Sequence, residues 1–538
     1  MGHHKAVIST LLATCAWVGA AYPASAGTPL SIAAGRAKLH LLGEAGGDEV
    51  KALRAAIAQA SSTSGSPAWA SQLQGLLRSG GYPFARVVAQ RGGAPTLVAF
   101  GELDGLPRFD IASKLDAARL QALYQRAICP QQPDSGGCVV RSHNLERATA
   151  LLSLQPEVKD VSLEVDPEAT DPNGKIALTV KVKGHERPVQ VSVTADNSGT
   201  PSLGHMQTGL AISAPNLVPG GSVTAEITAS NRKDFTGAAS WTQGIGDRGV
   251  QTIAQVSRTT YSMVLPAPTN PTLNGRVMSA SIGLSYPVAM NFDRILKMQA
   301  DAGMILSKVA VDAVGTLQQR RIPYLDLTLS GGSGLRALGA GRNYAQGSVT
   351  LRLGKPSDSA QSAAAQDAAG PQELGNFARL GAQLVAHHDL GLSPWAAGIE
   401  LRGQWASRNL DPSQQLGVGG PDGVRAYRAD EGGLDTGALV NLSLSRALPP
   451  LGTVQLVPQA FLDYAVGREH YSTWAGWNNG SPGLSNTRRL GAIGLGVDAS
   501  AGKLNASLSV ARQLPGVNVS VADPTSKTQV WASAQLLF

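Results

Sequence analysis

The feature that most restricts the fold of this chain is a two-residue alternation of apolar and polar side chains along its C-terminal half. The chain ends in TQVWASAQLLF, where one wholly apolar face contains Val530, Ala532, Ala534, Leu536 and Phe538. A period of two is the pattern of a β-strand whose two faces meet different surroundings. The same alternation occurs in KLNASLSVA, AIGLGVD and TVQLVPQAFLDY, and from Met278 to Tyr286.

Two architectures accommodate such strands: a soluble sandwich and a membrane barrel. The polar partners are small or uncharged, as in a water-filled lumen, and the strands have about the 9–11 residues of a tilted membrane strand. Long and short connections also alternate, as in outer-membrane barrels. Going back from Phe538, they are 512–526 (long), 501–503 (short), 466–489 (long), 445–452 (short), 407–436 (long) and 389–395 (short). We therefore expect a barrel of roughly sixteen strands over 186–538, and Phe538 resembles the terminal signal of such barrels.

The first residues and the composition restrict where the chain works. Lys5, an apolar stretch and the small residues ending at Ala26 predict a secretory signal peptide over 1–26, rather than an anchor helix. The rest of the chain has no run of about 18 apolar residues, so no spanning helix is expected. The net charge of +7 is spread along the chain without a basic run, which argues against nucleic-acid binding. The aromatic content, 5%, is low for a membrane barrel.

Two cysteines remain after the predicted signal peptide, Cys129 and Cys138, in CPQQPDSGGC. An exported chain with a Pro/Gly-rich spacer favours a disulfide, which contributes about 2–3 kcal/mol for a small loop. The alternative, a metal site, lacks further Cys or His at ligand spacing. The adjacent His387 and His388 point to opposite faces of a strand, so we expect no metal there.

Residues 36–185 have a different pattern, with apolar residues at helical spacing between short strands. Residues 36–108 read as strand, helix, helix, strand, strand, with helices in DEVKALRAAIAQA and PAWASQLQGLLRSGGY. In 109–185, helices are expected in IASKLDAARLQALYQRAI and SHNLERATALLSL, and strands in VKDVSLEVDP and KIALTVKVKG. Two small α+β modules before a barrel indicate docking domains, because such modules expose a sheet edge that can accept an extended peptide.

Several stretches resemble the two-partner secretion transporters, the hemolysin-activator and filamentous-hemagglutinin transporter family of type V secretion. They are LLRSGGYPFARVVAQ, NLERATALLSLQPEVKDVSLEVDP, VSVTADNSGTPSLG, GQWASRNLDPSQQLGVGGPDGVRAYRADEGGLDTG and FLDYAVG. The resemblance runs from about residue 40 to Phe538, and 403–437 is its most specific part.

The resemblance implies a sixteen-stranded outer-membrane barrel preceded by two periplasmic POTRA domains, 36–108 and 109–185. Such proteins export one large unfolded partner, an adhesin or cytolysin rich in β-helix, without ATP or any other cofactor. They lie in outer-membrane lipid, into which the barrel assembly machinery inserts them. Many members also carry an N-terminal plug helix, but Gly27 to Lys38 leaves little room for one, so none is expected.

The family signature also implies a role for the long connection 407–436, which in such transporters folds back into the lumen. Its arginine pairs with an aspartate of the barrel wall. The loop motif matches here at Val424, Arg425 and Tyr427, and the wall motif at Phe461 and Asp463. Ala426 and Ala465 stand where the family has glycine, and each adds a methyl group at a tight position.

Three other functions fit parts of the pattern. A barrel assembly factor has the same architecture, a passive porin would not need two docking modules, and a hydrolase needs a catalytic set. Neither a nucleophile elbow nor a Ser/His/Asp arrangement is evident in the sequence, so no enzymatic activity is expected.

Overall fold

The computed structural model describes most of residues 31–538. Outside the description lie residues 1–30 and the short stretches 35–36, 44–45, 62–63, 65, 91–94, 113–114, 132, 135–136, 166–174, 186–188, 202, 233, 265–271, 312–314, 334–342, 361–362, 392–393 and 479–484. The predicted signal peptide falls outside the described residues, as does most of the segment considered for a plug helix. Among the helices that the structure describes, none has the length and apolar character needed to cross a membrane.

The chain forms two compact units, and the first contains the described residues up to Asp104 together with Gly137–Arg141 and part of Asp166–Ala177. Its sheet has the order β1-β2-β4-β3, and a second small sheet pairs β5 with β8. The helices follow the apolar spacing, and Ser66 caps α2 by accepting a hydrogen bond from the backbone N of Trp69 at 3.1 Å. The elements are β1 (Ser31–Ala34), β2 (Ala37–Leu42), α1 (Gly47–Gln59), α2 (Pro67–Ser79), β3 (Arg86–Val88), β4 (Thr96–Ala99), β5 (Glu102–Leu103) and β8 (Lys175–Ile176).

The second unit begins with another small α+β module, whose sheet has the order β6-β9-β7. Its elements are β6 (Arg108–Ile111), α3 (Ala117–Ile128), α4 (Ser142–Ser153), β7 (Val158–Val165) and β9 (Leu178–Gly184). The helix expected from residue 111 starts six residues later, because Asp116 caps it by accepting from the backbone N of Arg119 at 3.2 Å. Cys129 and Cys138 are disulfide-bonded, as the spacing favoured.

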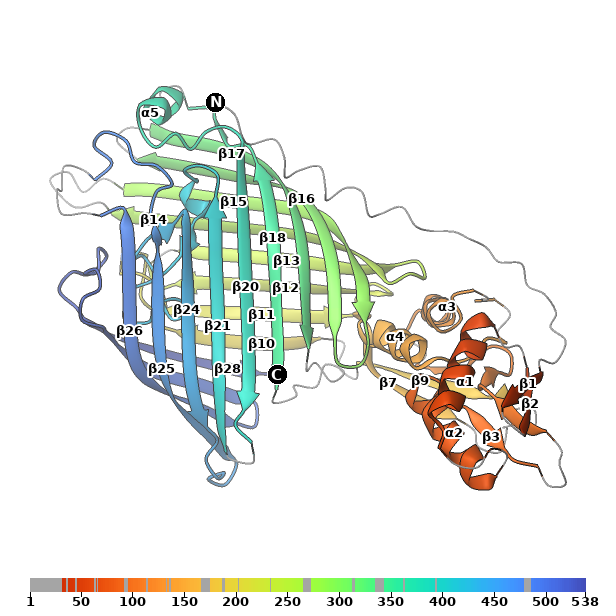
Figure 1. Ribbon diagram of the computed structural model, residues 1–538. Coiled ribbons are helices and arrows are strands. Elements are labelled where there is room, and N and C mark those ends of the chain that lie inside the picture. Colours follow the sequence, from red (N-terminus) through yellow and green to blue (C-terminus); the bar gives the residue numbers. More distant parts are fainter. Residues whose placement is uncertain are drawn as a thin grey trace, which may run out of the picture. The chain divides into compact units, whose positions relative to one another are not determined.

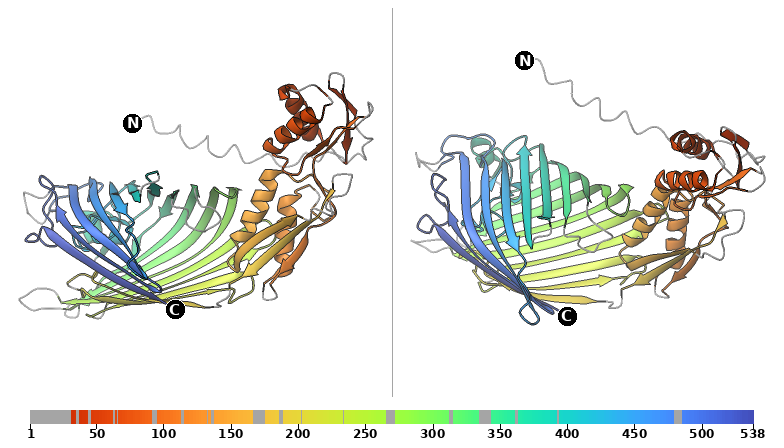
Figure 2. Two further views of the ribbon diagram at one scale, coloured as in Figure 1. Left: turned by 90° about the horizontal axis from the view of Figure 1, so that it is seen from below. Right: turned by 60° about the horizontal axis from the view of Figure 1, so that its bottom comes forward.

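The rest of the second unit is a closed antiparallel barrel of sixteen strands among the described residues (Figures 1 and 2). The first and last strands pair with each other, so no edge is left open. The strands are β10 (Gln190–Asp196), β11 (Gln207–Pro215), β12 (Gly221–Ser230), β13 (Phe235–Ile245), β14 (Val250–Val264), β15 (Thr272–Met290), β16 (Ile295–Val311), β17 (Gly315–Ser333), β18 (Tyr344–Gly354), β20 (Phe377–Asp389), β21 (Trp395–Ala406), β24 (Thr436–Arg446), β25 (Val454–Arg468), β26 (Thr487–Ala501), β27 (Leu504–Gln513) and β28 (Thr528–Leu537). The two-residue β19 (Ser357–Asp358) pairs with β17 beyond the end of β18.

The two faces of the barrel wall differ as the alternation predicts. The register aligns Leu284 of β15, Leu327 of β17 and Leu380 of β20, which point outward and are exposed. Thr328 and Thr350 alternate with them, point inward and share a hydrogen bond of 2.9 Å. An apolar outer face without an open edge suits hydrocarbon, where unpaired backbone groups are costly.

Candidate functional site in the barrel lumen

The connection between β21 and β24 lies inside the barrel. It contains the short helix η2 (Pro412–Gln414) and a two-stranded hairpin of β22 (Leu416–Gly417) and β23 (Gly433–Leu434). A buried cluster joins its side chains to inward-facing residues of β24 to β27. The loop contributes Val418, Val424, Ala426, Tyr427 and Leu434, and the wall contributes Leu439, Phe461, Ala465, Leu490, Ala492 and Ala511.

Arg425 at the tip of this loop contacts Asp463 of β25. Its Nε and Nη2 donate to the two carboxylate oxygens at 2.9 and 2.6 Å, and its backbone N donates to Oδ2 at 3.0 Å. The side chain of Asp463 is fully buried, whereas that of Arg425 is 14% exposed. The guanidinium also lies 3.4 Å from the ring centre of Phe461. A planar guanidinium can satisfy both the carboxylate and the ring, whereas a lysine ammonium offers one point of charge.

The remaining groups around the pair hold the loop backbone. Asn441 of β24 donates to Asp463 Oδ1 at 2.9 Å and to the carbonyl of Gly423 at 2.8 Å. Trp531 of β28 donates from Nε1 to the carbonyl of Arg425 at 2.7 Å. The Tyr427 hydroxyl donates to the carbonyl of Asn518 at 2.9 Å, in the connection between β27 and β28. Side chains and backbone groups far apart in the sequence therefore fix the short loop segment from Gly423 to Tyr427.

A second charged contact, which the sequence did not indicate, holds the loop at Glu431. Arg488 of β26 donates to Glu431 Oε1 at 2.5 Å, and the Glu431 side chain is fully buried. The same carboxylate accepts from the Ser520 hydroxyl at 2.5 Å and from the backbone N of Val521 at 2.9 Å. Here the charges are reversed: the loop supplies the anion and the wall supplies the cation.

The start of the loop is held by a third charged cluster. Arg320 of β17 contacts Asp411 at 2.5 Å, contacts Glu373, and lies 3.6 Å from Asp358. One guanidinium therefore meets three carboxylates. Burial raises the pKa of Glu373 to about 7, although Arg320 opposes the shift.

Polar side chains of the wall also hold η2. Arg352 of β18 donates to the Gln414 side chain at 2.7 Å and also binds both oxygens of Asp326, at 2.7 and 2.6 Å. Arg379 and Gln404 each donate to the Gln414 carbonyl at 3.1 Å.

The other residues singled out in the sequence have separate settings. Ala426 and Ala465 are both buried in the cluster, so their methyl groups are accommodated without moving the loop out of the lumen. Phe538 is exposed, and its backbone N donates to the carbonyl of Val191 at 2.9 Å. His387 stacks on Tyr344, and no group of three or more metal-binding side chains occurs in the part of the chain that the structure describes.

Glu431, Arg488, Asn441 and Trp531 were not found from the sequence. Glu431, Arg488 and Asn441 are polar residues in an alternating strand or a polar loop, where nothing distinguishes them from their neighbours. Trp531 carried a weak signal, because it interrupts the small polar residues on the inward side of the last strand.

The structure resembles solved outer-membrane proteins over nearly its whole length. CdiB from Escherichia coli matches with a TM-score of 0.71 and 15% identity, covering 96% of this chain and 93% of that one. CdiB from Acinetobacter baumannii matches with a TM-score of 0.64 and 14% identity, covering 93% and 89%. CdiB is a two-partner secretion transporter. The fold that the resemblance implies, a sixteen-stranded barrel preceded by small α+β modules, is confirmed.

Sequence comparison finds a curated transporter that matches part of the chain. The heme/hemopexin transporter protein HuxB of Haemophilus influenzae is 30% identical over 150 residues, which are 28% of this chain. The chain therefore spans about a quarter, 25%, of the length of HuxB. No family model matches the chain. BamA from Haemophilus ducreyi, lacking POTRA domains 1–3, matches in fold with a TM-score of 0.51 and 11% identity, covering 93% of this chain and 99% of that one.

Proposed function

We propose that this protein is an outer-membrane transporter that recognises one large unfolded secreted protein and passes it through its barrel to the cell surface. The observation that carries the proposal is the inward-folded loop pinned by Arg425 and Asp463. A loop with three charged attachments fills part of the lumen and can be displaced as a unit. A passive porin has no use for such an obstruction. The relatives in sequence and fold are transporters, which supports a function without enzymatic chemistry.

We further propose a function for each part of the chain. Residues 36–108 and 109–185 are periplasmic docking domains, 186–538 is the membrane barrel, and the loop 407–436 controls passage. A disulfide between Cys129 and Cys138 fits an oxidising compartment outside the cytoplasm. The partner is a large exported protein of the adhesin or cytolysin kind, rich in β-helix, which is recognised while extended. The barrel itself would reach the membrane through the barrel assembly machinery.

Energy for export comes from the partner in this proposal. No ATP reaches the periplasm, and folding of the partner outside the cell makes its return unfavourable. Extended chains lose little backbone hydrogen bonding when they add to a sheet edge, so docking modules with exposed edges suit an unfolded cargo.

The test is export of a large secreted protein whose gene is found beside this one. Cells with the intact chain should release that protein, and cells with residues 36–184 deleted should retain it although the barrel is inserted. The second candidate, insertion of other outer-membrane proteins, is favoured only by the fold similarity to BamA. If loss of the gene depletes many outer-membrane proteins and not one secreted protein, the assembly function is correct and export is wrong.

A further inference from the structure

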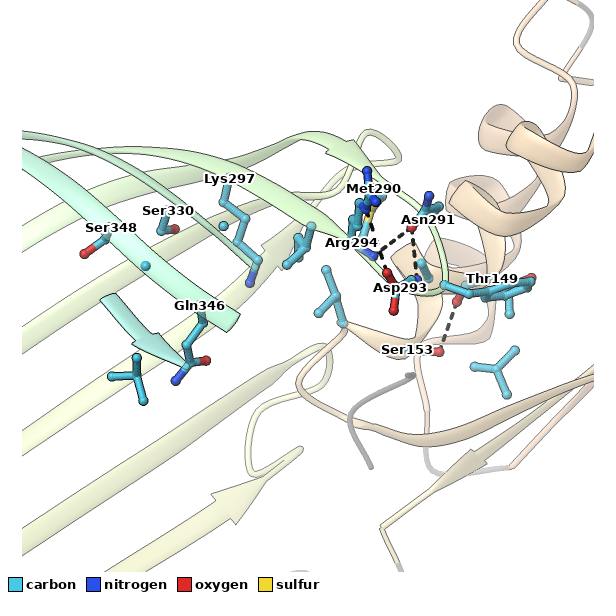
Figure 3. Close-up of a pocket in the computed structure, with 18 of the residues that line it drawn as sticks. Thr149, Ser153, Met290, Asn291, Asp293, Arg294, Lys297, Ser330, Gln346 and Ser348 are labelled. Atoms are coloured by element: carbon cyan, nitrogen blue, oxygen red, sulfur yellow. Dashed lines mark hydrogen bonds and ion pairs between the residues drawn. The ribbon is translucent and has the colours of Figure 1, made fainter. Parts of the chain in front are cut away.

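A cavity of about 550 Å³ lies within the second unit, between the α+β module and the inner wall of the barrel (Figure 3). One side is made by α4 and the start of β7, and the other by β16, β17, β18 and β20. The turn from Met290 to Arg294 joins β15 to β16 and also lines the cavity, and Asn291 shapes it by accepting from the backbone N of Arg294 at 2.7 Å. The mechanism proposed for the loop uses none of these residues.

The wall side of the cavity presents a row of polar side chains across four strands. The register aligns Lys297, Ser330, Ser348 and Gln383 as successive neighbours. Neighbouring strands lie about 4.8 Å apart, so the row extends over roughly 14 Å, the length of about four residues of extended chain. Hydroxyl and amide groups at this spacing can both donate to and accept from the backbone of such a segment.

Lys297 gives the cavity an unsatisfied positive charge. The residue is half-buried, and among the described residues no carboxylate lies within ion-pair distance of its ammonium group. The other charged residues lining the cavity are Lys159, Asp160, Asp293 and Arg294, and the last two lie 3.8 Å apart. The lining therefore has three cations against two anions. A half-buried ammonium without a partner favours an incoming carboxylate.

The opposite side of the cavity is mixed, with apolar side chains beside Thr149, Ser153, Lys159 and Asp160. Leu154 and Val161 come from the α+β module, and Met290 and Phe292 come from the turn. Phe292 is 43% exposed, which leaves its ring available for contact. An extended segment between the two sides meets the row of polar wall side chains on one face and the apolar side chains of Leu154, Val161 and Phe292 among those on the other. Because side chains of an extended chain alternate between faces, this environment fits alternating apolar and acidic residues.

We propose that this cavity is a docking site for an acidic, extended segment of the exported protein, with apolar side chains toward Phe292 and a carboxylate on Lys297. The proposal rests on the transport function proposed above and adds the chemistry of the cargo segment. A lysine-rich segment is disfavoured by the excess of cations. A β-hairpin or helix does not fit, because only an extended chain presents its backbone groups to the row of wall side chains.

The test uses the full-length protein in detergent micelles and a fluorescent eight-residue peptide of alternating valine and aspartate. Binding is measured by fluorescence anisotropy. Lys297→Gln should weaken binding about fivefold, the loss of roughly 1 kcal/mol for a partly exposed ion pair, and Lys297→Arg should restore most of it. Lys308→Gln is the matched control, because Lys308 lies on the same strand, outward-facing and exposed, and should leave binding unchanged.

A peptide with lysine in place of aspartate should bind weakly to every variant. Equal binding of the two peptides, or equal binding by the wild type and Lys297→Gln, would overturn the proposal. The proposed function is judged separately, by export of the neighbouring gene product from cells. If export is normal and Lys297→Gln binds the peptide as the wild type does, only the docking-site proposal is refuted. If the wild type does not export the protein, the proposed transport function is refuted.

Discussion

Arg425 and Asp463 are joined by three hydrogen bonds, although they lie 38 residues apart and on different structural elements. Two bonds come from the guanidinium and one from the arginine backbone, so the carboxylate fixes both the side chain and the path of the loop. The Phe461 ring lies under the guanidinium at 3.4 Å. The fully buried Asp463 has Asn441 as a further donor. The contact is therefore specific for arginine in both charge and shape.

Replacing Arg425 with alanine should loosen the loop and impair export while leaving the barrel inserted. The change leaves the buried Asp463 without its cation, which costs about 3–5 kcal/mol in comparable pairs. Export of the partner protein measures the first effect, and heat-modifiable migration of the barrel in gel electrophoresis measures its insertion. Arg425→Lys should rescue only in part, because an ammonium cannot bind both carboxylate oxygens in the same plane.

Arg428 supplies the matched control for that experiment. It belongs to the same loop, but its partner is Asp430, two residues along, and Asp430 is 32% exposed in its side chain. Arg428→Ala should therefore cost less than about 1 kcal/mol and leave export intact. Normal export from Arg425→Ala, or an equal defect in Arg428→Ala, would contradict the assigned role.

Replacing Glu431 with alanine should release the second attachment of the loop. The substitution removes the acceptor for Arg488, Ser520 and the Val521 backbone at once, and it leaves the buried Arg488 with only the more distant Glu469, 3.7 Å away. We expect a loss of about 3–5 kcal/mol for the buried pair. Protease cleavage of the loop 407–436 should become faster, and Glu431→Gln should be intermediate because it still accepts hydrogen bonds. Unchanged cleavage in both variants would show that the loop is held elsewhere.

The segment 371–376, which shares Arg320 with the start of the loop, should become less stable between about pH 5 and pH 7. Burial raises the pKa of Glu373 to about 7, so the folded state binds its proton more tightly than the unfolded chain does. The associated stability is fully present below the unfolded pKa and is lost as the pH rises through the folded pKa, by at most about 3 kcal/mol. Hydrogen exchange of residues 371–376 at pH 5 and pH 8 measures the change. Glu373→Gln should show no such difference, and an equal difference in that variant would refute the assignment.

An arginine on the outer face should prevent stable insertion. Leu327 is 46% exposed and belongs to the outward apolar face of β17, where an arginine costs about 2–4 kcal/mol near the middle of a membrane. Leu327→Arg should lower the amount of folded barrel in membranes. Thr328→Arg, one residue along but facing the lumen, should insert normally. A reversed result would mean that the two faces of the wall are assigned the wrong way round.

The strands and helices were largely predictable because they depend on neighbours in sequence. The alternation in AIGLGVD and KLNASLSVA predicted β26 and β27, and the helical spacing of Leu73, Leu76 and Leu77 predicted α2. The short strands β1 and β6 were missed because four residues are too few to show a period. The start of α3 was misplaced, because the cap at Asp116 outweighed the helical pattern before it.

The sequence by itself determined which face of each strand meets lipid, because alternation is a local property that fixes burial once a sheet forms. Its family motif also singled out Arg425 and Asp463. Only the tertiary structure decided what surrounds that pair, since closing the barrel brings Asn441, Trp531 and the Asn518 backbone from separate strands and loops onto one segment. The same closure created the Glu431–Arg488 contact and the cavity at Lys297, which depend on groups far apart in sequence and on the shape of the enclosed space.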